Sequence, residues 1–170
     1  MAVFLIFVFI TNGISESEKQ EYINKWRELV CVESQRSGIP ASIIQGQAIL
    51  ESSYGRSPLA TNANNHFGIK CKRYWTGKVY HMKDDDRNAA GHLISSCFRA
   101  YDQGTDSFVD HSHFLMNSLC YRSLQDFDKE DYKSWAKGLF ECGYATDQSY
   151  PKKLIRCIEV HRLWEMDTGQ

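Results

Sequence analysis

The apolar side chains of this chain recur mostly with the period of an α-helix, about 3.6 residues. Ser15 and Glu18 have the spacing of a capping box, and apolar positions around Trp26 then repeat at helical spacing until Gly38. A second apolar run starts directly after a proline and predicts a helix over residues 41–53. The first part of the chain is therefore predicted to form two consecutive helices.

Helical spacing returns in the second half of the chain. Residues 105–118 carry one apolar stripe, and another begins after Asp128 and ends at Gly143. A last helix, for which either Asp147 or Ser149 can serve as the N-cap, carries a core-facing stripe toward the C-terminus. These runs predict three further helices.

The pattern changes between the two helical halves. Residues 66–71, 78–82 and 94–101 are short β-prone pieces, separated by polar or glycine-containing stretches. We expect them to form a small antiparallel sheet or hairpin. The predicted fold class is α+β, a mainly helical domain with a minor β-lobe.

Length and composition limit the organisation of the protein. A chain of 170 residues with 42% hydrophobic and 13% aromatic residues can build one core, so residues 16–170 are expected to form a single, monomeric domain. The formal net charge is -1 and the lysines and arginines form no block. Nucleic acid is therefore not an expected partner.

The N-terminal segment has the pattern of a secretory signal peptide. Residues 2–10 are uninterruptedly apolar, and the small and polar residues 11–15 follow. The apolar run is too short to span a bilayer. We expect residues 1–15 to be a signal peptide, the protein to be exported, and no stable membrane insertion after processing. A buried N-terminal strand is the alternative.

Six cysteines form an even set, which in an exported protein predicts disulfides. Cys71 and Cys97 bracket the predicted hairpin and could join its ends. Cys31 and Cys157 lie on the first and last predicted helices, where a bridge would close nearly the whole chain. Buried free thiols are the alternative, because six cysteines allow 15 connectivities.

Other cofactor chemistry has weak support in the sequence. No pair of cysteines has CxxC spacing, so zinc binding is not expected. His111 and His113 follow Asp110, but residues two apart on a helix diverge by about 200° and do not converge on one metal. No GxSxG or Cys/His signature of a nucleophile is present. We expect neither a metal nor a cofactor.

Glu51 is the strongest single candidate for chemistry. It ends the second predicted helix, on the same face as Ile44 and Ala48, so its carboxyl should emerge beside apolar side chains that disfavour the charged form. Such surroundings produce a general acid. The alternative is a solvated glutamate in the last helical turn.

The sequence around Glu51 belongs to an ordered set of motifs. It is GlnAlaIleLeuGluSerSerTyrGly, and AsnAsnHisPheGlyIleLys at 64–70, TrpThrGlyLys at 75–78 and TyrAlaThrAspGlnSerTyr at 144–150 follow. This set resembles the glucosaminidase family of bacterial cell-wall hydrolases, family 73 of the glycoside hydrolases, over residues 39–158. The resemblance implies a lysozyme-like fold with a cleft between helices and hairpin.

The resemblance also implies roles for particular residues. Glu51 matches the general acid, and Tyr144 matches a tyrosine that lines the cleft close to it. Asp86 stands where a second carboxylate of the β-lobe is expected, with Asp84 and Asp85 as rivals. The alternative for these three aspartates is a solvated hairpin tip.

Further residues flank the implied cleft. Aromatic faces suit the apolar side of a pyranose, and polar groups suit its rim. The candidate substrate-binding residues are Tyr54, Asn65, Phe67, Trp75 and Asp147. For Asp147 we expect a local structural role, in which its side chain accepts from the amides of the next turn and fixes the approach of Tyr144.

Together with the N-terminal pattern, the resemblance implies an exported hydrolase that cuts β-1,4 links in peptidoglycan after N-acetylglucosamine, an endo-β-N-acetylglucosaminidase. Its partners would be peptidoglycan glycan strands. A lytic transglycosylase or a muramidase on the same fold is one alternative. A non-catalytic glycan-binding module is another.

Overall fold

The computed structural model describes residues 13–87 and 91–168 of the chain. A long helix, α1 (Glu16–Ser37), is followed by α2 (Ala41–Ser52) and by a short α3 (Pro58–Ala63). The hairpin of β1 (Val79–Arg87) and β2 (Leu93–Arg99) comes next. The second helical half is α4 (Gly104–Met116), α5 (Leu119–Ser123), α6 (Tyr132–Glu141) and α7 (Tyr150–Val160), with 3-10 turns at Leu124–Asp126 and Leu163–Met166.

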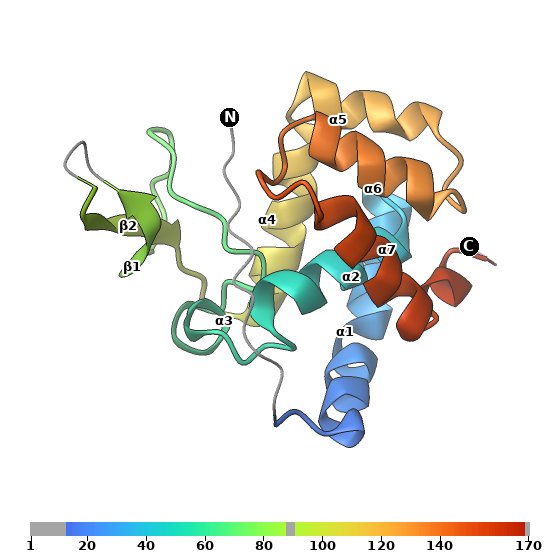
Figure 1. The fold of residues 1–170 in the computed structure, drawn as a ribbon, viewed down its shortest axis with the longest axis horizontal. Helices are drawn as coiled ribbons and strands as arrows, with labels where there is room; N and C mark the ends of the chain where they lie inside the picture. The colour runs from blue at the N-terminus through green and yellow to red at the C-terminus, as the bar shows by residue number, and fades with distance from the viewer. Residues whose placement is uncertain (1–12, 88–90, 169–170) are drawn as a thin grey trace.

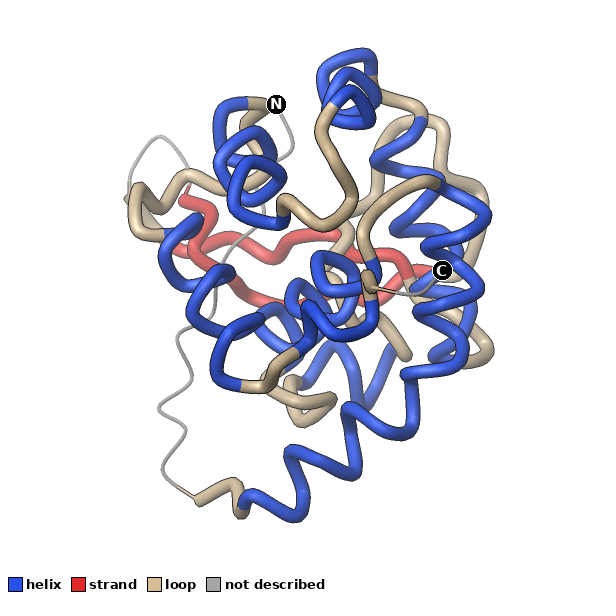
Figure 2. The backbone as a smooth tube through the Cα atoms, turned by 90° about the vertical axis from the view of Figure 1, so that its right-hand side faces the viewer, coloured by secondary structure: helices blue, strands red, loops and turns tan. Residues whose placement is uncertain are grey.

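The hairpin projects from one side of a helical body (Figure 1). In the view turned by 90°, from the side of the helical body away from the hairpin, the strands lie behind helices (Figure 2). The expected α+β fold with a small antiparallel β-lobe is confirmed.

Local signals fix the first helix as the sequence predicts. The Ser15 hydroxyl accepts from the Glu18 amide at 3.2 Å, and the Ser15 amide donates to the Glu18 carboxylate at 2.8 Å. Gly38 ends the helix with a φ of 78°. The capping box and the stop at glycine are both confirmed.

Helix α2 lies at the centre of the core. It is buried on nearly every side, as expected for a helix without a polar face. It packs against α1 and α7. A Cβ at Gly46 would lie 2.8 Å from Leu154 Cδ1 of α7, so the absence of a side chain there lets the two helices approach closely. This contact joins the middle of α2 to the middle of α7.

The strands pair antiparallel, with His81 opposite Cys97 and an irregular register between Lys83 and Arg87. The β-prone piece at residues 66–71 forms no strand and contributes only a single bridge, between Lys70 and Phe98. Two strands therefore replace the three pieces that the pattern marked.

An ion pair joins the β-lobe to the helices. The buried Arg99 guanidinium of β2 makes two hydrogen bonds, of 2.9 and 2.7 Å, to the Asp110 carboxylate of α4. The Tyr101 hydroxyl donates to the same carboxylate at 2.5 Å. The orientation of the hairpin on the helical body is thus fixed by hydrogen bonds to charged groups, which are the stronger kind.

Several predicted boundaries differ from the structure. The helix expected over 105–118 ends at Met116, and a separate helix starts at Leu119, which is 79% exposed. Helix α6 is capped by Asp131, whose carboxylate accepts from the Ser134 amide at 3.0 Å. Asp128 accepts only within its own turn, from the Glu130 amide at 2.9 Å, and therefore does not start the helix. The short α3 was not predicted.

One of the two expected disulfides is confirmed and the other is wrong. Cys71 and Cys97 are bridged, with Cα atoms 5.3 Å apart. Cys31 and Cys157 are free thiols, and the second bridge instead joins Cys120 to Cys142. The reason is packing. Helix α1 packs mainly on α2 and α4, whereas α7 packs mainly on α6 and α2, so these two helices do not present their cysteines to each other.

Residues 1–12 of the expected signal peptide lie outside the described residues. Within the described part of the chain, no helix is both long and apolar enough to cross a membrane.

Candidate active site

Glu51 lies in the last turn of α2 and is only 6% exposed. Ile44 and Ala48, on the same face, are fully buried. No hydrogen-bond partner reaches Glu51 Oε1 from the described residues. Burial raises the pKa of the carboxyl well above its usual 4.5. Glu51 is therefore a buried carboxyl that holds its proton to higher pH than a solvated one.

The chain reverses direction immediately after this glutamate. Ser53, Tyr54 and Gly55 all adopt the left-handed conformation, with φ of 50°, 57° and 75°. The Ser52 hydroxyl accepts from the Gly55 amide at 2.7 Å and donates to the Ala48 carbonyl at 2.5 Å. Non-glycine residues in this region cost of order 1 kcal/mol each and concentrate at functional sites. The end of α2 is thus held in one strained, well-braced turn.

Two tyrosines surround Glu51 on the side of α7. Tyr144 and Tyr150 are fully buried, and their ring centroids are 5.4 Å apart. Burial, and then the charge of Glu51, raise the pKa of both phenols. The Gln47 amide donates to the Tyr150 hydroxyl at 2.8 Å. Tyr150 is therefore a core anchor.

Tyr144 occupies a different place from the one that the sequence suggested. We expected it to line the cleft, but its side chain has no exposed surface. Gly143, with a φ of 79°, turns the chain inward after α6, and the Tyr144 amide donates to the Leu139 carbonyl at 3.0 Å. In this arrangement the phenol lies inside the core of the protein.

Asp147 holds the turn that leads into α7. Its carboxylate accepts from the Ser149 amide at 2.8 Å and pairs with Lys153 at 2.7 Å. The Lys153 ammonium, followed by the Ser149 hydrogen bonds, lowers the pKa of Asp147 to about 2. The expected acceptance from the next turn is confirmed, and this carboxylate braces the segment that follows Tyr144.

Two of the expected substrate contacts are buried inside the protein. The Asn65 amide donates to the carbonyls of Ile69 and Arg99, and its oxygen accepts from the amides of Phe67 and Ile69, all between 2.9 and 3.3 Å. Phe67 has no exposed surface and stacks on His111 with ring centroids 3.9 Å apart. Both residues support the loop that leads to the hairpin and present no group to solvent.

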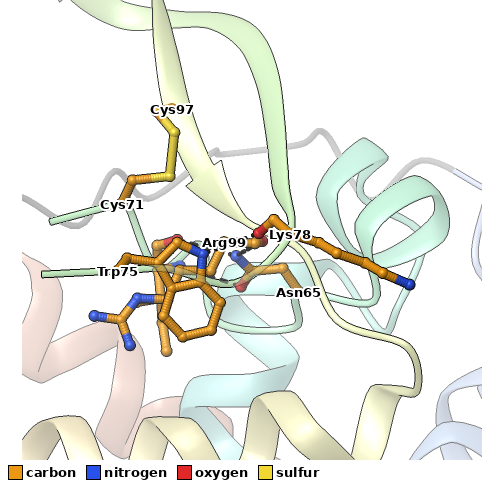
Figure 3. The surroundings of a disulfide bond; sticks show 7 residues. Asn65, Cys71, Trp75, Lys78, Cys97 and Arg99 are labelled. Carbon is orange, nitrogen blue, oxygen red and sulfur yellow. Dashed lines mark hydrogen bonds between the residues drawn. A yellow bond between two sulfur atoms is a disulfide. The ribbon is translucent and has the colours of Figure 1, made fainter. Parts of the chain in front are cut away.

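Tyr54 and Trp75 keep partly exposed rings. The Tyr54 hydroxyl is 2.7 Å from His161 Nε2, at the end of α7. The Trp75 indole lies over the Arg99 guanidinium, 4.5 Å from its ring centre, and donates to the Lys78 carbonyl at 2.9 Å (Figure 3). Trp75 is therefore the expected platform that a ligand could still reach in the β-lobe.

Asp86 belongs to strand β1, within the irregular register between Lys83 and Arg87. Its side chain, like those of Asp84 and Asp85, lies outside the described residues. Its role as the second carboxylate stays a prediction.

A hydrogen-bond network that the sequence did not reveal braces the turn after Glu51 from the opposite side. The Tyr22 hydroxyl of α1 lies 3.1 Å from Ser52 Oγ and 2.9 Å from His66 Nδ1. Burial lowers the pKa of His66 to about 4, so the ring is neutral at neutral pH. Tyr22 and His66 border a pocket of about 230 Å³ that is also lined by Trp26 and Tyr54.

The two histidines of α4 differ in environment. His111 is fully buried, and burial lowers its pKa to about 3, whereas His113 is exposed. Asp110 is engaged by Arg99. Within residues 13–87 and 91–168, no three potential metal ligands come together.

A buried glutamate at a helix end, a helical body and a small β-lobe define a lysozyme-like domain. The family model described as mannosyl-glycoprotein endo-beta-N-acetylglucosaminidase matches residues 28–163, most of the chain. The chain belongs to this glucosaminidase family.

Relatives and solved structures agree with this assignment. The chain is 28% identical to the exo-glucosaminidase LytG of Bacillus subtilis over 98% of its own length, and 28% identical to the peptidoglycan hydrolase FlgJ of Vibrio cholerae over 89%. The catalytic domain of the autolysin Auto from Listeria monocytogenes has a TM-score of 0.75 and 27% identity, with 91% of this chain and 90% of that chain covered. A mutant peptidoglycan hydrolase from Sphingomonas sp. A1 has a TM-score of 0.71 and 31% identity, with 86% and 97% covered.

The chain spans 62% of the length of LytG and 47% of the length of FlgJ.

Proposed function

We propose that the protein is an exported peptidoglycan hydrolase that cleaves β-1,4 glycosidic bonds after N-acetylglucosamine, with Glu51 as the general acid. The observation that carries the proposal is the buried carboxyl of Glu51 at the end of α2, whose pKa is raised by burial. Family membership and the names of the relatives support peptidoglycan as the substrate.

Hydrolysis of a glycosidic bond needs a proton for the leaving oxygen and a second group that activates water or stabilises the cationic transition state. The raised pKa favours the protonated form of Glu51, which can donate to the glycosidic oxygen and become charged as the bond breaks. Tyr144 and Tyr150 limit the water around this carboxyl and preserve its raised pKa. They are positioning residues in this mechanism.

For the second group we propose Asp86, on the hairpin that projects beside the helical body. The test compares Asp86→Asn with Asp84→Asn and Asp85→Asn, because the three substitutions change the net charge equally. Only a carboxylate that faces the cleft should matter, so Asp86→Asn should reduce the rate far more than its neighbours do. If none of the three reduces it by more than about tenfold, or roughly 1.4 kcal/mol, the proposal for this run is wrong. The substrate's own acetamido group would then be the remaining candidate.

Export is supported by the two disulfides, since such bonds persist in oxidising compartments. The apolar N-terminal segment supports it independently. Glycan strands of the cell wall are then the accessible partner.

The test of the reaction is mass spectrometry of the fragments released from purified peptidoglycan. Hydrolysis after N-acetylglucosamine leaves a reducing N-acetylglucosamine end. A reducing muramic acid end would identify a muramidase, and an anhydromuramyl end a lytic transglycosylase. Binding to peptidoglycan without any release would leave only a glycan-binding module.

A further inference from the structure

The disulfide between Cys120 and Cys142 lies next to the tyrosines that surround Glu51. It connects the first turn of α5 to the C-cap of α6, with Cα atoms 5.6 Å apart. Tyr121 follows Cys120 directly, and Tyr144 follows Cys142 after one residue. The rings of Tyr121 and Tyr144 pack edge to face, with centroids 6.3 Å apart. The bridge therefore ties together the two backbone segments that carry this aromatic pair.

Helix α5 is a short element that packs on α4 and on the 3-10 turn that follows it. It is only five residues long, and Leu119, its first residue, is 79% exposed. A helix this short is not stable by itself. Tyr121 is its buried residue, and it faces Tyr144. The disulfide at Cys120 thus restricts the movement of α5, the helix that carries Tyr121 and packs it on Tyr144.

The same bridge anchors the turn on the other side. Cys142 caps α6, and the Gly143 and Tyr144 amides donate to the carbonyls of Phe140 and Leu139 at 2.8 and 3.0 Å. Tyr144 in turn packs on Tyr150, whose hydroxyl accepts from the Gln47 amide one helical turn before Glu51. A displacement of this turn would admit water to the Glu51 carboxyl.

We propose that the Cys120–Cys142 disulfide is a positioning element for the general acid, and that its reduction lowers the activity of the folded protein. The inference rests on the proposed function of Glu51. Cys120 is exposed and Cys142 is partly exposed, so a dithiol reductant can reach the bond. Two electrons and two protons pass to the cystine, both cysteines become thiols, and the reductant becomes a disulfide. Reoxidation restores the bridge and the activity.

The test uses Cys120→Ala/Cys142→Ala, with Cys31→Ala as the control that removes a free thiol elsewhere. Both are assayed on peptidoglycan below the temperature at which circular dichroism shows unfolding. A misplaced reacting group typically costs tenfold to a hundredfold, so kcat of the double variant should fall by about tenfold or more with little change in KM. The control should keep the wild-type kcat.

The pH profile separates positioning from a general loss of stability. Hydration of Glu51 would lower its pKa, so the basic limb of the kcat/KM profile should move to lower pH in the double variant. A cycle with Tyr144→Phe adds a second criterion. If the bridge acts through Tyr144, the combined loss is smaller than the product of the separate losses. An unchanged kcat with an unmoved limb in the folded double variant overturns the inference.

A measurement without substrate tests the inference even if wild-type protein shows no hydrolysis, which would refute the proposed function alone. Hydrogen exchange at the Gly143 and Tyr144 amides should accelerate in the double variant and in reduced wild type, while α2 stays protected. Equal protection of these amides with and without the bridge overturns the positioning role.

Discussion

The side-chain amide of Gln47 donates a 2.8 Å hydrogen bond to the hydroxyl of Tyr150, one helical turn before Glu51. Both residues are fully buried. This bond joins α2 to the start of α7 at the level of the candidate acid. It complements the close approach at Gly46, where the two helices meet without an intervening side chain.

Tyr150→Phe should destabilise the protein by roughly 1–3 kcal/mol, because the buried Gln47 amide loses its partner. Adding Gln47→Met should recover most of this loss, since both polar groups are then replaced by apolar ones of similar size. Urea denaturation of the two single variants and the double variant measures the effect. Losses that simply add in the double variant would show that the two groups do not interact.

Glu51→Gln should stabilise the protein at neutral pH. The folded pKa of Glu51 is raised above its unfolded value of 4.5, so the folded state binds more protons between the two values. The free energy of unfolding of the wild type therefore falls as pH rises through this window, by about 1.4 kcal/mol for each unit of pKa difference. Glu51→Gln cannot ionise at this position, so its free energy of unfolding does not fall in this way as pH rises.

Chemical denaturation at pH 7 and at pH 4 measures this difference. The variant should be more stable than the wild type at pH 7, and the gap should shrink at pH 4, where both states of the wild type carry the proton. A gap of the same size at both pH values would mean that the carboxyl is solvated in the folded protein.

His111 should make the protein sensitive to acid. Burial lowers the pKa of His111 from 6.5 to about 3. Between these pH values the imidazole is protonated in the unfolded chain and neutral in the folded protein. Stability is therefore lost as pH falls from 6.5 toward 3. His111→Phe keeps a ring against Phe67 and Tyr144 and removes this titration.

Denaturation midpoints measured between pH 7 and pH 4 should decline less steeply in His111→Phe than in the wild type. The matched control is His113→Gln, a change at an exposed position of the same helix. An identical decline in all three proteins would contradict the account of His111.

Local signals in the sequence predict much of the fold. The capping box of Ser15 and Glu18, the stop at Gly38 and the apolar neighbours of Glu51 on its own helix face all depend on residues within one or two helical turns of each other. Such short-range features can be predicted from residue spacing alone. The short α3 was not predicted, because six residues are too few to show a helical periodicity.

Features that depend on packing could not be predicted in this way. The pairing of Cys120 with Cys142 arises because the end of α6 lies beside α5 in the folded protein. Residue spacing does not reveal this contact. The full burial of Tyr144 and the hydrogen bond from the Asn65 side chain to the Arg99 carbonyl likewise depend on chain segments far away in sequence. Gln47 lies one helical turn before the candidate acid, on an adjacent part of the helix surface. Its position could have been used to predict a polar side-chain contact beside Glu51.

The central claim is that Glu51 donates the proton that breaks the glycosidic bond. Glu51→Gln removes the donor with almost no change in shape, so the variant should fold and should still bind purified peptidoglycan. The direct measurement is the release of reducing ends from peptidoglycan by wild type and variant at equal concentration. The account predicts that the variant loses hydrolysis, because positioned acid catalysis contributes roughly 100-fold or more. Activity in a folded variant above about one per cent of the wild-type rate would contradict it.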